Sequence, residues 1–133
     1  MRVDFYEMSG RFDDPLEVAC ILVGKAYPAV DDIAIVGPRE TLERLDERLW
    51  ETPTGRFLPH GIDDGRAPIV LADRAPERTR LLINLDASAP LPAGRYDRVL
   101  EIVPPHEDAR PRLRRRGTEW TAAGAELHHH RLK

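Results

Sequence analysis

The sequence predicts an α/β fold with three layers, in which a mostly parallel, twisted sheet carries helices on both faces. Short apolar segments alternate along the chain with segments whose apolar residues recur at helical spacing. The apolar run 81–85 is nearly continuous, as expected for a central strand that is covered on both faces. An alternating order of strands and helices favours a parallel sheet, because each helix carries the chain back across the sheet.

The first half of the chain is expected to run strand, helix, strand, helix. Residues 3–8 alternate in polarity and include aromatic side chains, which suits a strand. Asp14 can accept hydrogen bonds from free backbone amides and Pro15 fits a first helical position, so a helix begins here. A short strand follows at 32–36, and Pro38 opens a second helix. The apolar helix faces comprise Leu16, Ala19, Cys20, Val23 and Tyr27 in the first helix and Leu42, Leu45 and Leu49 in the second.

The second half is expected to supply three more strands and one helix. The strands are expected at 68–72, 81–85 and 98–103, with loops rich in proline between them. A last helix is expected over 107–123, and Gly124 is expected to end it. Residues 124–133 are expected to form a short extended tail. No repeat or linker divides the sequence, so we expect a single domain over residues 1–133.

Composition indicates a soluble protein that is not exported. Charged residues make up 32% of the chain, and no apolar stretch approaches the roughly 20 residues that span a bilayer. The N-terminus lacks a basic segment followed by an apolar run, as a secretory signal requires. Cys20 is the one cysteine, which fits a reducing compartment. We therefore expect a cytoplasmic location without membrane contact.

Neither nucleotide binding nor catalysis is expected, and we expect no cofactor. The turn before the first helix has one glycine followed by Asp13 and Asp14, which would repel a phosphate. No Walker-type lysine followed by Ser or Thr occurs in the chain. Cys20 lies on an apolar helix face, and Ser9 and Ser88 have no neighbouring base in the sequence.

The histidine run His128–His130 predicts no metal site. Adjacent side chains of an extended segment point to opposite sides, so at most two of the three imidazoles converge. His60 and His106 each follow a proline, where a hydrogen-bonded structural imidazole is the more common role.

Arginines crowd the segment 110–116, although the net charge of the chain is −3. Leu113 and Trp120 are seven residues apart on one side of the predicted helix, and arginines flank them. A notch of this kind would accept an apolar side chain together with a carboxylate, which arginine binds with two parallel hydrogen bonds. The alternatives are a solvated helix face and a weak, salt-sensitive site for nucleic acid.

A second feature is the pair Trp50 and Phe57, which lie on either side of a short loop ahead of His60. The two aromatic side chains either close the core or form an exposed patch that binds another protein.

Four segments closely resemble the DNA polymerase III chi subunit family. They are residues 45–50 (Leu-Asp-Glu-Arg-Leu-Trp), 57–60 (Phe-Leu-Pro-His), 69–71 (Ile-Val-Leu) and 103–108 (Val-Pro-Pro-His-Glu-Asp). The last of these segments comes directly before a basic helix. Their order and spacing match the family over nearly the whole chain. The resemblance implies a Rossmann-like fold without a phosphate-binding loop, no reaction of its own, and an accessory role in the DNA polymerase III holoenzyme during DNA replication.

The resemblance also implies two partners and a site for each. One is the psi subunit of the clamp loader, which the family pattern places at Trp50, Phe57 and His60, a surface also offered to a helicase-like protein. The other is the acidic C-terminal tail of single-stranded DNA-binding protein. Nucleic acid is then bound mainly indirectly. The implied tail-binding residues are Arg112, Leu113, Arg114, Arg115, Arg116 and Trp120.

Within the tail site, the resemblance places the carboxylate-binding arginine at Arg115, or at Arg114 if the alignment slips by one residue. The sequence departs from the family pattern at Gly117 and Glu119. Glycine inside a helix costs about 0.5–1 kcal/mol relative to alanine, and Glu119 adds a negative charge where an acidic tail favours a positive one.

Overall fold

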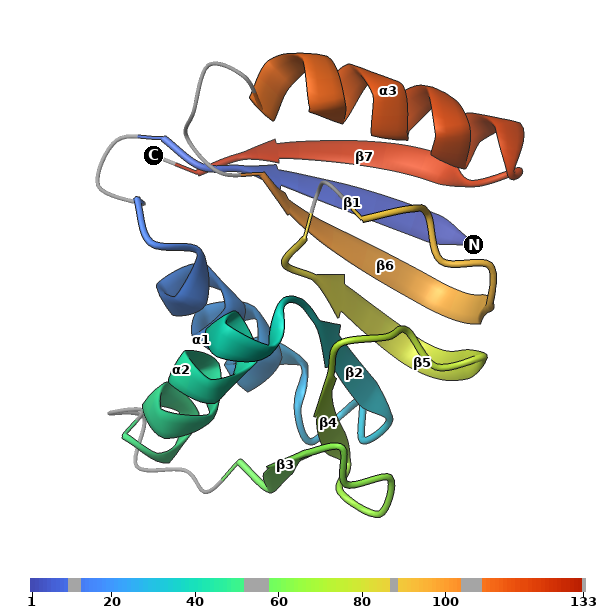
Figure 1. Ribbon diagram of the computed structural model, residues 1–133. Helices are drawn as coiled ribbons and strands as arrows, with labels where there is room; N and C mark the ends of the chain where they lie inside the picture. Colours follow the sequence, from blue (N-terminus) through green and yellow to red (C-terminus); the bar gives the residue numbers. More distant parts are fainter. Residues whose placement is uncertain (10–12, 52–57, 87–88, 104–108, 133) are drawn as a thin grey trace.

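A computed structural model of the chain confirms the α/β fold (Figure 1). It describes residues 1–9, 13–51, 58–86, 89–103 and 109–132, and only the backbone of residues 109 and 110. The elements in chain order are β1 (Arg2–Glu7), α1 (Pro15–Ala26), β2 (Ile33–Val36), α2 (Arg39–Trp50), β3 (His60–Ile62), β4 (Ile69–Ala72), β5 (Arg78–Asn84), β6 (Arg95–Val103), α3 (Ala109–Ala122) and β7 (Glu126–Arg131).

The strands form one seven-stranded sheet in the order β3-β4-β2-β5-β6-β1-β7, and every pairing in it is parallel. β2 occupies the centre of one half, between β4 and β5, and all four of its residues are buried. β1 occupies the centre of the other half, between β6 and β7. The first and last strands of the sequence are therefore neighbours.

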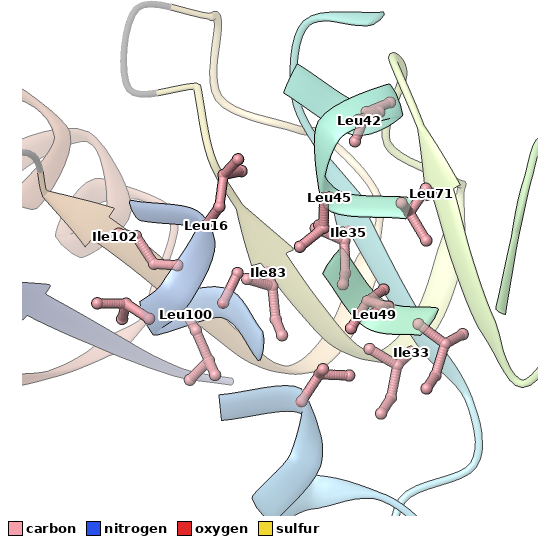
Figure 2. Packing of buried hydrophobic residues seen from close by; sticks show 14 of the residues in the cluster. Leu16, Ile33, Ile35, Leu42, Leu45, Leu49, Leu71, Ile83, Leu100 and Ile102 are labelled. Carbon is pink, nitrogen blue, oxygen red and sulfur yellow. The ribbon is translucent and has the colours of Figure 1, made fainter. Parts of the chain in front are cut away.

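The two faces of the sheet carry different helices. α1 and α2 cover one face, where their leucines and valines pack against side chains such as Ile35, Leu71 and Ile83 (Figure 2). α3 lies over the opposite face, where Trp120 packs with Val3, Phe5 and Val99. These two surfaces are called the α1/α2 face and the α3 face below. The predicted three-layer arrangement is confirmed.

The predicted start of α1 agrees with its hydrogen bonding. The Asp14 carboxylate accepts a hydrogen bond from the Leu16 amide at 3.0 Å, and Pro15 is the first helical residue. α2 begins after Pro38 without a side-chain cap, and its Leu42, Leu45 and Leu49 are buried as predicted.

Two strands were not predicted from the sequence. β3 has only three residues, one of them glycine, so it lacks the apolar alternation by which a sequence predicts a strand. Residues 126–131 were expected only as an extended tail, but they pair with β1 along its length, from Arg2 opposite Glu126 to Glu7 opposite Arg131. Their polar side chains hide this role, because β7 lies at a partly exposed sheet edge.

The last helix ends as predicted, since Gly124 adopts a positive φ of 89°, which glycine accommodates without strain. α3 begins at Ala109, and the expected start at residues 107 and 108 lies outside the described residues. Among the described residues, no helix has both the length and the apolar character needed to span a membrane.

Candidate partner-binding surfaces

α3 is attached to the sheet by a charged network that is almost completely buried. Glu101 points from β6 into the α3 face with 2% of its surface exposed. One of its carboxylate oxygens accepts hydrogen bonds from Arg116 Nε at 3.1 Å, Arg116 Nη2 at 2.8 Å and Trp120 Nε1 at 3.0 Å. The other accepts one from Asn84 Nδ2 at 2.7 Å. The network thus joins β5, β6 and α3.

The network extends to the segment that follows β5. Arg116 Nη1 donates a hydrogen bond to the Ala89 carbonyl at 2.6 Å, and Asn84 Nδ2 also donates to the Asp86 carbonyl at 3.0 Å. In the described residues, no buried side-chain nitrogen or oxygen lacks a hydrogen-bond partner. Because a buried charge is costly unless it is paired and hydrogen-bonded, this satisfied network is a defined attachment point for α3.

The prediction that Trp120 and Arg116 line a notch open to a partner is wrong. Trp120 is 1% exposed and Arg116 is 5% exposed, so both side chains hold α3 on the sheet and neither is open to a partner. The physical reason is Glu101, whose carboxylate needs donors in the interior. The sequence contained a signal for this network, because Glu101 is a single acidic residue in an otherwise apolar strand segment, 99–103. Such a residue predicts a buried cationic partner.

Three predicted arginines remain accessible on α3. Arg112, Arg114 and Arg115 are exposed, and Leu113 is half-buried against the α3-face cluster. None of the three arginines forms an ion pair with the residues that the structure describes. Their guanidinium groups are therefore available to a negatively charged partner.

The exposed arginines lie on two different flanks of α3. Adjacent helical residues are rotated by about 100°, so Arg114 and Arg115 cannot point the same way. Gly117 faces β7, since a Cβ atom built there would lie 3.7 Å from Leu127 Cδ1. Arg114 precedes Gly117 by three residues and shares this β7 flank. Arg116 donates a hydrogen bond to Ala89, which lies on the side of α3 away from β7. Arg112 and Arg115 lie on that same side and form the flank opposite the β7 flank.

At the end of α2, Trp50 is exposed, with 57% of its surface accessible. Its ring centroid lies 4.4 Å from that of His60, and the planes are tilted by 49°. His60 is buried: Nδ1 lies 2.6 Å from the Leu58 carbonyl oxygen and Nε2 lies 3.2 Å from Asp46 Oδ1. His60 thus supports the Trp50 ring from below. The Trp50 side chain therefore does not close the core, which was one of its two alternatives. Phe57 lies outside the described residues.

The three histidines of β7 have separate contacts. His129 stacks on Phe5 with ring centroids 5.2 Å apart, and His130 stacks on Tyr6 at 4.7 Å. His128 Nε2 lies 3.1 Å from Glu126 Oε1. Within the described residues, no cluster of three or more His, Cys, Asp or Glu side chains has the arrangement of a metal site.

His130 also belongs to a polar cluster around Asp4 on the α1/α2 face. The Asp4 carboxylate has no exposed surface and is bound by Arg98 Nε at 2.7 Å, His130 Nε2 at 2.7 Å and Arg2 Nη2 at 3.0 Å. Burial alone would raise the pKa of Asp4, but hydrogen bonds from Arg98, His130 and Arg2 outweigh it and lower the pKa to about 2. The hydrogen bond to Asp4 in turn raises the pKa of Arg98. This cluster connects β6, β1 and β7.

Comparison with solved structures shows that the fold recurs elsewhere. The chain is similar to one in the structure of a variant of S. cerevisiae Dbp5 bound to Nup159, Gle1, IP6 and ADP, with a TM-score of 0.68 and 14% identity. The similarity covers 98% of this chain and 42% of that chain. At this level of identity the similarity concerns the fold alone.

Comparison at the sequence level is more specific. The family model described as DNA polymerase III chi subunit, HolC, matches residues 1–128. The chain is 32% identical over 91 residues to DNA polymerase III subunit chi of Escherichia coli (strain K12), which covers 63% of this chain and 62% of that relative. It is 28% identical over 120 residues to DNA polymerase III subunit chi of Haemophilus influenzae, which covers 84% of this chain and 83% of that relative. The chain therefore belongs to the DNA polymerase III chi subunit family.

Proposed function

We propose that this chain is a non-catalytic accessory subunit of the DNA polymerase III holoenzyme. It links the clamp loader, through the psi subunit, to the C-terminal tail of single-stranded DNA-binding protein, and it acts in the cytoplasm as part of the replisome. One observation carries the proposal: exposed binding groups of two kinds, an indole and a set of guanidinium groups, lie on opposite faces of one sheet. Two partners can therefore bind at the same time.

The acidic tail binds the exposed arginines of α3. Arg112, Arg114 and Arg115 supply the positive charge on the two flanks of the helix, and the half-buried Leu113 adds some apolar surface. Arg116 and Trp120 contribute indirectly, because their hydrogen bonds to Glu101 hold α3 in place. Arginine suits this task, since its guanidinium binds a carboxylate through two parallel hydrogen bonds.

The psi subunit, or a helicase-like protein in its place, binds the exposed face of Trp50. Large aromatic side chains contribute much of the binding energy at protein interfaces when a partner covers them. His60 packs under the indole and fixes its position, and Phe57 belongs to the same proposed surface.

Titration calorimetry with an acidic peptide that ends in an apolar residue and a free carboxylate tests the tail site. Replacement of Arg112, Arg114 and Arg115 by alanine is expected to weaken binding by at least about tenfold, because charge-assisted hydrogen bonds are lost. Added salt and amidation of the peptide terminus should weaken it as well. Arg44→Ala is the matched control, since Arg44 is an exposed arginine of α2. The tail site would be contradicted if the triple variant bound the peptide as tightly as the parent does, and if the parent bound the amidated peptide as tightly as the peptide with a free carboxylate.

Co-purification with psi tests the second surface. Trp50→Ala is expected to remove psi from the complex while the circular dichroism spectrum and unfolding midpoint stay close to those of the parent, because Trp50 is exposed. Ile21→Ala provides the control, since Ile21 is an exposed apolar residue of α1, with 39% of its surface accessible. Retention of psi by the Trp50 variant would exclude this surface.

The alternative function is weak binding of nucleic acid by the chain alone, which the three exposed arginines favour. The net charge of −3 opposes it, because long-range attraction to a phosphate backbone requires positive potential. Fluorescence anisotropy with a labelled single-stranded oligonucleotide separates the two. Salt-sensitive binding that disappears in the triple arginine variant would support the alternative.

A further inference from the structure

β7 forms one edge of the sheet. It is last in the strand order and pairs with β1, and within the described residues no strand pairs with its outer side. At six residues it is twice as long as β3, the strand at the other edge. An unpaired edge presents backbone N–H and C=O groups to which another extended chain can bind.

The hydrogen bonds to β1 determine which backbone groups of β7 face outward. The Glu126 amide donates to the Met1 carbonyl at 3.0 Å, and the Leu132 amide donates to the Glu7 carbonyl at 2.9 Å. Alternate residues of a parallel strand bond to the same neighbour, so the even-numbered residues 126–132 face β1. Leu127, His129 and Arg131 consequently direct their amides and carbonyls away from the sheet.

The side chains along this edge are suited to an acidic peptide. Arg131 is exposed at the end of β7, and Arg114 is exposed on the β7 flank of α3. Arg131 shares the α3 face with His129, which stacks on Phe5, because alternate side chains of a strand point to the same face. α3 runs along β7 (Figure 1). The edge therefore has the guanidinium group of Arg114 beside it on α3 and that of Arg131 at its end. Glu126, at the opposite end, lies close to His128.

We propose that an extended acidic peptide binds along β7 as an eighth strand of the sheet, with Arg114 and Arg131 bound to its carboxylates. This inference rests on the proposed function, for which it specifies the flank of α3 and the mode of binding. Main-chain hydrogen bonds to Leu127, His129 and Arg131 provide affinity, and the two arginines select an acidic sequence. Glu126 repels an acidic residue at the start of the strand, so the negative charges of the peptide lie toward the Arg131 end.

Amide hydrogen exchange on the full chain, measured by NMR with and without the acidic peptide, tests strand addition. Binding is expected to slow exchange at Leu127, His129 and Arg131 by at least about tenfold, because these amides gain a hydrogen-bond acceptor. The even-numbered amides of β7 already bond to β1 and serve as internal controls. Binding that leaves the three outward amides unprotected overturns strand addition but leaves the proposed function intact. Failure of the peptide to bind overturns both.

Peptide variants with one N-methyl group provide a second measurement. A bound strand directs alternate amides to β7, so methylation at alternate positions is expected to abolish binding while methylation at the intervening positions is tolerated. Equal tolerance at every position overturns the proposal.

Substitution of the arginines tests the flank. Arg114→Ala is expected to weaken peptide binding by about tenfold and to do so more than Arg115→Ala, because only Arg114 lies on the β7 flank. Glu126→Gln is expected to strengthen binding about two- to threefold, because it removes one exposed negative charge that repels the peptide. A larger loss for Arg115→Ala than for Arg114→Ala places the peptide on the opposite flank and overturns the proposal.

Discussion

At the scale of single residues, Glu101 is expected to contribute strongly to stability, because its buried carboxylate accepts four hydrogen bonds. Glu101→Ala would leave the Arg116 guanidinium buried without its counter-ion. We expect this change to lower the free energy of unfolding by about 3–5 kcal/mol, as measured by urea denaturation. Replacing Glu101 and Arg116 together by methionine should cost less than Glu101→Ala alone, since no charge is then left unpaired. A loss below about 1 kcal/mol for Glu101→Ala would show that the network contributes little.

Asp4 gives the protein a specific dependence on pH. Its pKa is about 2 in the folded state, below the value of 3.8 for an unperturbed aspartate. A depressed pKa stabilises the fold above the unfolded value, and this contribution disappears as pH falls through the folded value. Denaturant unfolding at several pH values should therefore show the stability advantage of the parent over Asp4→Asn present at pH 4 and shrinking toward pH 2. An advantage that is constant over this range would contradict the assignment.

At the scale of elements, α3 contains a glycine that packing does not require. A Cβ atom at Gly117 would meet Leu127 at 3.7 Å, an ordinary contact distance. Gly117→Ala is therefore expected to stabilise the protein by about 0.5–1 kcal/mol, which thermal unfolding can measure. Gly94→Ala is the contrasting variant, because its Cβ would lie 2.6 Å from the Glu77 carbonyl oxygen and should destabilise. If Gly117→Ala also destabilises, glycine has a role at the β7 flank that its packing does not reveal.

The elements differ in how far the sequence predicted them. α1 and α2 follow from local signals, namely the Asp14 cap, two prolines and apolar spacing. β3 and β7 depend on partners distant in sequence, and their own residues are short or polar. The exposure of Trp50 and the burial of Trp120 likewise followed from tertiary contacts, since both tryptophans occur in helices with flanking arginines. Local pattern predicted where the helices lie, and packing decided which side chains they expose.

At the scale of the whole molecule, alternation of strands and helices predicted the sheet and its parallel direction, but not the strand order. That order requires β1 to be separated from β2 by two strands and to be enclosed by β6 and β7. This arrangement buries the apolar β1 side chains Val3 and Phe5, and their burial exists only in the assembled sheet. The resemblance to the family, in contrast, was accessible from sequence because short segments in a fixed order carry it.

The position of β1 also has a consequence for the order of folding. Both neighbours of β1 come from the last third of the chain, and the pairing of β1 with β7 joins residues more than 120 positions apart. Such non-local contacts give a high contact order, for which slow folding is typical. On the ribosome, which extends a chain from its N-terminus, β1 is made before the other described strands but must wait for β6 and β7 before it can pair. The surface that carries both β7 and the exposed arginines of α3 therefore forms only after synthesis has passed residue 131, so a nascent chain that lacks β7 does not present the proposed site for an acidic peptide.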